Sequence, residues 1–463
     1  MFKRFYLLLG SHTFLIVPLI FTSPAAAVQL LGRAILRADT FTPGPTSGQQ
    51  ISIPFTEQQP VQGFSAVLPG PKPGTFRVLA DNGFGLKNNS ADFLLRVYAV
   101  EPDFTTGQVF PVNFQTGERL TRFSQESFLQ LNDRNNQIDF PLIAEQSLYP
   151  ETTIPVDSKI QSNRWLTGAD FDIESFRQAS DGTYWFGDEF GPFLLHVSAD
   201  GQVLDAPIPL PNFLGLGDNP LVQSPDNPQL DSTANLGGSN GFEGLALNSS
   251  GTKLYAMLEG ALQPDDQRDR LLINEFDLAT KKYTGKTFFY QRDPLGRAIG
   301  DLTAINDHEF LVIERDNRTG DPNNPEFPRP AEFKRIYKID INQIDSDGFV
   351  QKELLVDLLN IPDPNNLGGN GTTDGVFTFP FVTIESVLPV DDKTLLVIND
   401  NNYPFSKGRS PDQPDNNEFI LIQLDQSLNL APSQATPVPE PMTILGSAVA
   451  FDFGILFNAK KRQ

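Results

Sequence analysis

The chain has 463 residues, enough for a large hydrophobic core, and contains 36 glycines, 38 prolines and 38 phenylalanines. Its hydrophobic content of 39% excludes global disorder, and the many glycine, proline and phenylalanine residues favour short strands and turns over long helices. The 57 acidic residues outnumber the 35 basic ones, which argues against nucleic acid or anionic lipid as a main partner, and the lack of cysteine excludes disulfides and thiolate metal sites.

The N-terminal residues have the order of a secretory signal peptide. Lys3 and Arg4 precede an apolar run over residues 5–21, and three alanines at 25–27 supply a small-residue cleavage site. We therefore predict that residues 1–27 are removed during export and that the mature chain begins near Val28.

The middle of the chain repeats one pattern five times. Each copy has an alternating strand, a turn rich in Gly, Asp or Pro, a second apolar strand and a polar ending, which is typical of a β-hairpin. After most hairpins a further pair of strands follows, as in residues 193–204 and 272–283. Four strands per repeat are typical of a propeller blade, so the sequence predicts an all-β fold, a β-propeller over residues 28–436.

The spacing of the copies leaves room for one more blade. A gap of 109 residues separates Ser65 from Glu174, and the predicted strand over residues 30–41 belongs to none of the five copies. We predict six blades, with the N-terminal strand pairing with a strand over residues 419–428 to close the ring. Five or seven blades, and two stacked β-sandwich domains, are the alternatives.

Carboxylates recur at two places in the copies. Alignment of the hairpins puts one residue of each copy in a first column, Ser65, Glu174, Glu243, Asp301 and Glu385. A second column contains Asp81, Asp188, Glu259, Glu314 and Asp400. Inner strands of a propeller border its central channel, so acids that recur once per blade can converge on one face. Turn capping is the alternative, but glutamate is a poor turn capper and its recurrence in the first column favours a site.

Converging carboxylates suit hard divalent cations such as Ca²⁺, which takes about six to eight oxygen ligands. We predict that the metal ligands are Glu174, Glu243, Glu259, Asp301 and Glu385. A bound metal can hold a phosphate ester and activate a water, so a nucleophilic side chain is not required. The candidate catalytic residues are Asp188, Glu189 and Glu243, and the candidate substrate-binding residues are Arg315 and Arg318.

Four short sequence motifs in the repeats together resemble the phytase-like propeller family, which is described as having esterase-like activity of phytase. The resemblance covers roughly residues 64–424 and rests on LTGADFDIESF, GDEFGP, GFEGLAL and the ending VINDNN. It implies hydrolysis of phosphoric or related esters of small molecules, and we expect a monomer. Two alternatives are a non-enzymatic extracellular propeller that binds polysaccharide or protein, and a lactone or carboxylic-ester hydrolase.

The C-terminal residues 437–463 have the features of a second targeting signal. The sequence PVPEP at 437–441 precedes an apolar segment over 442–457 and a basic end, Lys460 to Arg462. This order resembles the PEP-CTERM sorting signal of Gram-negative bacteria, in which an exosortase-type membrane protease removes the tail. The resemblance implies a secreted or cell-surface protein that associates transiently with a membrane through its tail. A plain membrane anchor is the alternative.

Overall fold

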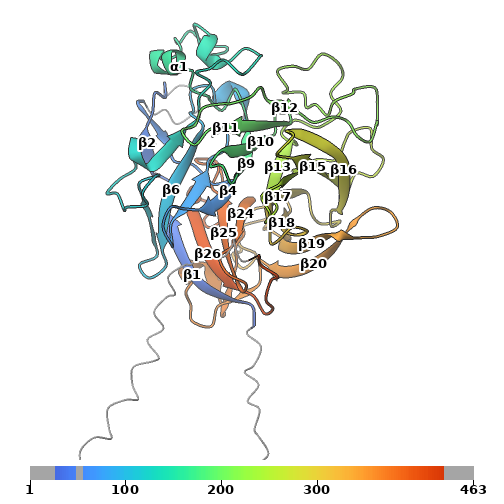
Figure 1. Cartoon of the computed structure of the whole chain (residues 1–463). Helices are drawn as coiled ribbons and strands as arrows, with labels where there is room; N and C mark the ends of the chain where they lie inside the picture. The colour runs from blue at the N-terminus through green and yellow to red at the C-terminus, as the bar shows by residue number, and fades with distance from the viewer. Residues whose placement is uncertain (1–26, 48–55, 432–463) are drawn as a thin grey trace, which may run out of the picture.

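The structure is a computed structural model and describes residues 27–47 and 56–431 (Figure 1). Its regular elements are almost all β-strands, which confirms the predicted all-β class. None of the helices in these ranges has the length and apolar character needed to span a membrane. The predicted sorting tail, and the signal peptide up to residue 26, lie outside the described residues.

Twenty of the described strands fall into five groups of four antiparallel strands, which we call blades 1 to 5 (Figure 1). Blades 2, 3 and 4 are separate sheets, whereas blades 5 and 1 belong to one sheet, because β1 also pairs in parallel with β7 at Ile35 opposite Gln108. Blade 1 contains β4 (Ala66–Pro69), β5 (Phe76–Leu79), β6 (Arg96–Asp103) and β7 (Gln108–Pro111). Blade 2 contains β9 (Ile173–Gln178), β10 (Tyr184–Asp188), β11 (Phe193–Val197) and β12 (Ile208–Pro209). Blade 3 contains β13 (Phe242–Leu247), β14 (Lys253–Leu258), β15 (Arg270–Asp277) and β16 (Lys282–Gln291). Blade 4 contains β17 (Ala298–Ala304), β18 (Glu309–Arg315), β19 (Lys334–Ile344) and β20 (Val350–Asp357). Blade 5 contains β24 (Thr383–Pro389), β25 (Thr394–Asp400), β26 (Asn417–Gln423) and β1 (Gln29–Leu36).

The first-named strand of each blade is its inner strand. The inner strands contact one another in the order β4, β9, β13, β17 and β24, and β24 returns to contact β4. A closed ring of antiparallel sheets around one axis is a β-propeller, as predicted. The described strands form five such groups of four, so the predicted count of six is not confirmed.

Residues 112–172, where a sixth blade was expected, contain few regular elements. Their apolar runs are short and interrupted by Asn, Asp, Gln and Pro, so no run alternates long enough to build a four-stranded sheet. The one strand here, β8 (Phe128–Gln130), pairs with β6 at the edge of blade 1. The other regular elements of this segment are η2 (Gln125–Ser127), η3 (Ile143–Glu145) and α1 (Ser158–Asn163).

The N-terminal strand is the fourth strand of blade 5 and closes the ring. Alternate residues of β1 are buried, which matches the side-chain period of two in a strand with one covered face. β1 pairs antiparallel with β26 from Gln29 opposite Gln423 to Leu36 opposite Asn417. The predicted closure is therefore confirmed, although the strand completes a fifth blade and not a sixth.

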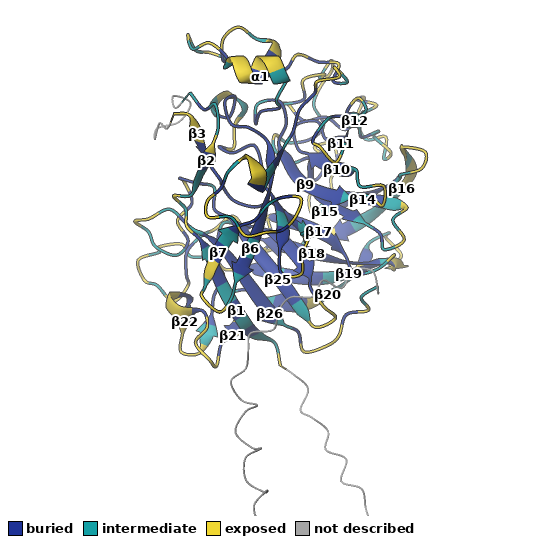
Figure 2. Ribbon diagram, turned by 60° about the vertical axis from the view of Figure 1, so that its left-hand side comes forward, coloured by how far each residue is buried: buried dark blue, intermediate teal, exposed yellow. Residues whose placement is uncertain are grey.

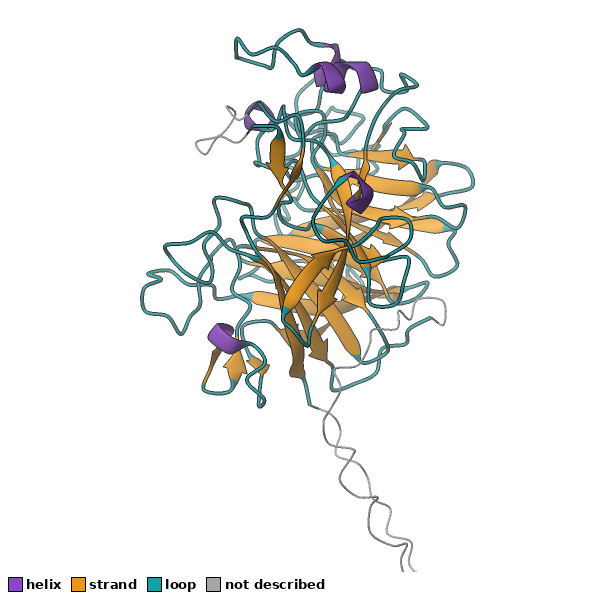
Figure 3. Cartoon of the chain, turned by 90° about the vertical axis from the view of Figure 1, so that its left-hand side faces the viewer, coloured by secondary structure: helices purple, strands orange, loops and turns teal. Residues whose placement is uncertain are grey.

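The loops that connect the blades contain short strands and 3₁₀ helices. β2 (Phe41–Pro43) pairs with β3 (Gln58–Pro60), and β23 (Val376–Phe377) lies between β21 (Ile361–Pro362) and β22 (Thr372–Thr373). Two further 3₁₀ helices are η1 (Lys87–Asn89) and η4 (Gly369–Gly371). These elements lie outside the four-stranded blades (Figure 3).

Most residues of the blade strands are buried, as their dark blue colour in Figure 2 shows. Apolar side chains of neighbouring blades form shared clusters. Phe176 and Phe186 of blade 2 stack at 5.8 Å between ring centroids, in one cluster with Ala66 and Leu79 of blade 1. The aromatic residues therefore pack between blades, as predicted. The recurring carboxylates lie near the start of each inner strand and the end of its neighbour, at one end of the ring.

Candidate metal centre

Four inner strands carry a β-bulge at the same place, and in three of them a glutamate occupies the bulge. In β9 the pairing with β10 passes from Ser175 to Ile173 and skips Glu174. β13 skips Glu243 and β24 skips Glu385 in the same way. A bulged residue has no partner residue opposite it, and the bulge redirects its side chain. These glutamates thus occupy equivalent positions in blades 2, 3 and 5, as the first alignment column predicted.

In blade 4 the bulge falls on Gly300, which leaves Asp301 one residue further along the strand. Asp301 Oδ1 lies 3.1 Å from Arg177 Nη2 of blade 2, and its Oδ2 accepts the backbone N–H of Val387 of blade 5 at 3.0 Å. Asp301 was predicted to be a metal ligand. The structure places it in a buried ion pair that links three blades, and not with the bulge glutamates.

In blades 2 and 4 the strand register shifts the second alignment column by one residue, from Asp188 to Glu189 and from Glu314 to Arg315. The register of the strand pairs gives its equivalent positions as Asp81, Glu189, Glu259, Arg315 and Asp400. Asp188, predicted to be catalytic, accepts the backbone N–H groups of Asp172 at 2.9 Å and Gly191 at 2.7 Å. Its contacts are therefore those of a turn cap, the alternative raised for this column.

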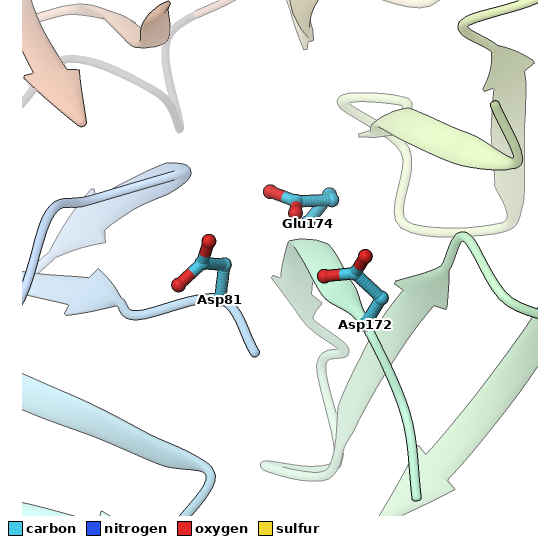
Figure 4. A group of neighbouring side chains, drawn as sticks. All are labelled: Asp81, Asp172 and Glu174. Atoms are coloured by element: carbon cyan, nitrogen blue, oxygen red, sulfur yellow. The ribbon is translucent and has the colours of Figure 1, made fainter. Parts of the chain in front are cut away.

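Five carboxylates converge from blades 1, 2 and 3. Ligand oxygens of Asp81, Asp172 and Glu174 all lie within 4.8 Å of one another, and Figure 4 shows these three side chains next to one another, with the carboxylates of Asp172 and Glu174 on the side of Asp81. Oxygens of Glu174, Glu189 and Glu243 form a second group within the same distance. Three predicted site residues, Glu174, Glu189 and Glu243, are thus brought together.

Several oxygens of the cluster are buried without a hydrogen-bond partner. The side chains of Asp172, Glu174, Glu189 and Glu243 have one such oxygen each. These four residues are between 3% and 8% exposed. A buried carboxylate without a partner is costly, because it has lost its hydration and gained nothing in return. An all-oxygen set of this kind fits a hard divalent cation such as Ca²⁺.

Burial raises the pKa of the clustered carboxyl groups, and repulsion between neighbouring acids adds to it. Burial is the largest cause of the rise for Asp172, whose pKa reaches about 7. Burial, Asp172 and Glu243 together hold the pKa of Glu174 well above its usual range. Burial also raises the pKa of Glu385 to about 8, although the charge of Arg315 opposes it. Such repulsion is relieved when a cation binds.

Arg315 is the one basic side chain among the described residues that occupy the two alignment columns, after correction for the strand register. Its Nη2 lies 3.0 Å from Glu385 Oε1 and 3.5 Å from Glu259 Oε1, while its Nε is buried without a partner. The predicted ligands Glu259 and Glu385 therefore contact a guanidinium and lie outside the two three-carboxylate groups. Arg318 lies at the surface, where it pairs with Glu332.

Two residues near the cluster were missed by the sequence reasoning. Asp172 precedes Glu174 by two residues, and the D-x-E spacing could have indicated it, since residues two apart in an extended chain face the same side. Lys87 follows the second strand of blade 1, in η1. Its Nζ donates to the backbone carbonyl of Asp226 and lies 4.6 Å from the ring centre of Phe190.

The sequence profile of the phytase-like family, described as esterase-like activity of phytase, matches residues 59–403. Because the match spans well over half of the chain, the protein belongs to the phytase-like family. The chain is also 26% identical to an uncharacterised secreted protein of Arthroderma benhamiae. That alignment covers 37% of this chain and only 39% of the relative.

Solved structures show weak similarity to the whole chain. A luciferin-regenerating enzyme overlaps with a TM-score of 0.35 at 13% identity, covering 89% of this chain and 99% of its own. The PQQ-bound aldose sugar dehydrogenase of Streptomyces coelicolor gives 0.31 at 11% identity, covering 87% and 99%. An arabinanase of Bacillus subtilis gives 0.31 at 11% identity, covering 78% and 92%. These values are too low to bear on activity, and the fold rests on the strand pairing itself.

Proposed function

We propose that this protein is an exported hydrolase of phosphoric esters that depends on a divalent cation, with Ca²⁺ as our candidate. The observation that carries the proposal is the set of four buried, unpartnered carboxylate oxygens at the axis of a propeller from an esterase-like family. The export part rests on the predicted signal peptide, and a secreted relative is consistent with it.

In this proposal Glu174, Glu189 and Glu243 hold the cation. When bound, a divalent cation neutralises part of the charge of a phosphate ester and lowers the pKa of a water molecule. Glu243 and Glu189 are our candidate general bases, because both place a carboxylate in the group. Asp188 is assigned to structure, since both of its oxygens accept backbone N–H groups.

Arg315 is our candidate for binding the substrate phosphate. Glu259 and Glu385 hold its guanidinium in place, and its buried Nε is free to donate a hydrogen bond. The two carboxylates also hold the pKa of Arg315 above its usual range, against the effect of burial, so it stays charged. A fixed guanidinium suits a planar contact with phosphate oxygens.

A carboxylic-ester or lactone hydrolase is the second candidate, which the description of the family as esterase-like favours. Both candidates use the same cluster, but a neutral ester does not need Arg315 as a partner. A non-enzymatic binding protein is the third possibility for such an extracellular propeller.

The test is a screen of the purified mature protein on phosphomonoesters, phytate and simple carboxylic esters, with Ca²⁺ and with chelator. We expect release of phosphate that requires the metal. Hydrolysis of carboxylic esters alone would select the second candidate. Lack of activity on every ester would leave the binding protein.

A further inference from the structure

The two groups of three carboxylates share one residue. Glu174 belongs both to the group with Asp81 and Asp172 and to the group with Glu189 and Glu243. A carboxylate has two oxygens and can contact one ion with each. The shared residue thus raises the question whether the cluster serves one cation or two.

Distances argue that a single cation cannot use all five carboxylates. Two oxygens on one Ca²⁺ are at most about 5 Å apart, twice the metal–oxygen distance. The oxygens within each group meet this limit, at 4.8 Å or less. Among the described residues no such group joins Asp81 or Asp172 to Glu189 or Glu243.

Each group also has unpartnered, buried oxygens of its own. In the first group Asp172 is 3% exposed and its Oδ1 has no partner. In the second group Glu189 and Glu243 are 4% and 3% exposed, and each has one oxygen, Oε1, without a partner. Glu174, which belongs to both groups, has an unpartnered Oε2. An ion at one group alone would leave unpartnered carboxylate oxygens buried in the other.

The charge of the five carboxylates also favours two cations over one. One divalent cation balances two of the five negative charges of the ionised cluster, and a second balances four. Arg315 contacts Glu259 and Glu385 and no member of either group, so it does not supply the missing balance by contact.

We propose that Asp81, Asp172 and Glu174 form a second divalent-cation site and that Glu174 bridges it to the ion held by Glu189 and Glu243 (Figure 4). This inference rests on the proposed metal dependence and deepens it. Two adjacent cations can stabilise the attacking and the leaving oxygen of a phosphoryl displacement at the same time.

The experiment is a count of bound ions. The mature protein is stripped with chelator, titrated with CaCl₂ and measured by native mass spectrometry and calorimetry. We expect two Ca²⁺ per chain in the native protein, one in Asp172→Asn, one in Glu243→Gln, and at least a tenfold weaker affinity for both ions in Glu174→Gln.

Asp170→Asn is the matched control. Asp170 is buried like Asp172, but its oxygens accept the backbone N–H groups of Ile143 and Thr167, and we expect this variant to keep both ions. Melting curves in chelator verify that each variant is folded. Should a variant fail to fold, the count on the native protein still decides.

Three outcomes would overturn the second site. A count of one ion that is lost in Glu243→Gln would remove the second site and leave the proposed function standing. Two ions retained in Asp172→Asn would place the second ion elsewhere. A native protein that binds no ion would overturn both the second site and the proposed metal dependence.

Discussion

At the scale of single residues, the site depends on which residue of each inner strand is bulged. Glu174, Glu243 and Glu385 occupy the bulges of their strands, whereas blade 4 has Gly300 there. A glycine contributes no ligand, and a Cβ at this position would lie 2.0 Å from the carbonyl oxygen of Ile384. The close approach of blade 5 therefore excludes a fourth glutamate at this position.

Glu243→Gln tests the role of charge in the cluster. The amide keeps the shape of the side chain but loses the charge, so we expect a folded protein whose ester hydrolysis falls by about 10²-fold or more. Steady-state kinetics on the ester identified by the screen measure this effect. Ser65→Ala, at the equivalent position of blade 1, is the control and should retain activity. Full activity of Glu243→Gln would mean that the catalytic centre lies elsewhere.

Asp301→Asn tests the structural role assigned to that residue. The substitution removes the negative charge that balances the buried Arg177, which keeps only the neutral acceptors Phe176 O, Leu302 O and Thr303 Oγ1, so we expect a loss of up to about 3–5 kcal/mol in the free energy of unfolding. Urea denaturation measures the loss. Glu118→Gln, which breaks an exposed pair with Lys72, should cost about 1 kcal/mol or less. Loss of a bound ion in Asp301→Asn, with stability unchanged, would restore the residue as a metal ligand.

The sequence could predict which residue types converge but not the register that selects them. The repeat identified Glu174, Glu243 and Glu385 because each lies in a hairpin with the same surrounding pattern. Asp301 was misassigned, since an acid one residue beyond the bulge aligns just as well by eye. Asp188 was placed in the second column for the same reason, although the strand register gives Glu189 as the equivalent position. A one-residue shift reverses the face of a strand, and the sequence carries no separate mark of the bulge.

At the scale of elements, the junction between β1 and β26 holds the ring closed through a buried ion pair. Glu418 of β26 is fully buried and accepts hydrogen bonds from Arg33 of β1 and from Arg409, whose Nε lies 2.9 Å from Glu418 Oε1. Burial alone would raise the pKa of Glu418, but the charges of Arg409 and Arg33 outweigh it and lower the pKa to about 2. The carboxylate therefore stabilises the closed ring when ionised.

The ion pair of Glu418 with Arg33 and Arg409 predicts that the free energy of unfolding falls in acid. Because the pKa of Glu418 is about 2 in the folded protein and about 4.3 in an unfolded chain, its contribution is complete above the unfolded value and is lost as the pH falls toward 2. The shift corresponds to about 3 kcal/mol. Urea denaturation of the native protein and of Glu418→Gln should show the largest difference near pH 7 and a shrinking one below pH 4. A difference that does not change with pH would contradict this assignment.

The sequence predicts the strand pattern of a single blade better than it predicts the number of blades. Hairpins repeat visibly because their strands alternate and their turns contain Gly, Asp or Pro. The 109 residues from Ser65 to Glu174 have the length of a blade and a half, but length does not reveal whether a segment forms a sheet. Residues 112–172 pack as loops and short helices, with Ile143, Tyr149 and Ile160 in a small core of their own.

At the scale of the whole molecule, the carboxylate cluster and the Arg177–Asp301 pair are contacts between blades. Asp81 belongs to blade 1, Glu174 and Glu189 to blade 2, and Glu243 to blade 3, so in our proposal one cation joins blades 1 and 2 and the other joins blades 2 and 3. Without bound cations, like charges face one another at the axis of a chain whose formal net charge is already −22. Metal removal should thus weaken the association of blades 1 to 3.

Thermal unfolding of the mature protein measures this link. An ion that binds only the native state stabilises it by about 2.7 kcal/mol at a hundred times its Kd. Unfolding entropy is about 2 cal/mol/K per residue, so for a chain of roughly 400 residues each such ion should raise the Tm by about 3 °C. We expect a rise that depends on Ca²⁺ concentration. Glu174→Gln should abolish most of it, because this residue belongs to both groups. NaCl at matched ionic strength is the control for general screening of the acidic surface. A Tm that is the same in chelator and in millimolar Ca²⁺ would show that the cluster does not bind this cation, and the unpartnered oxygens would then need protons to remain buried.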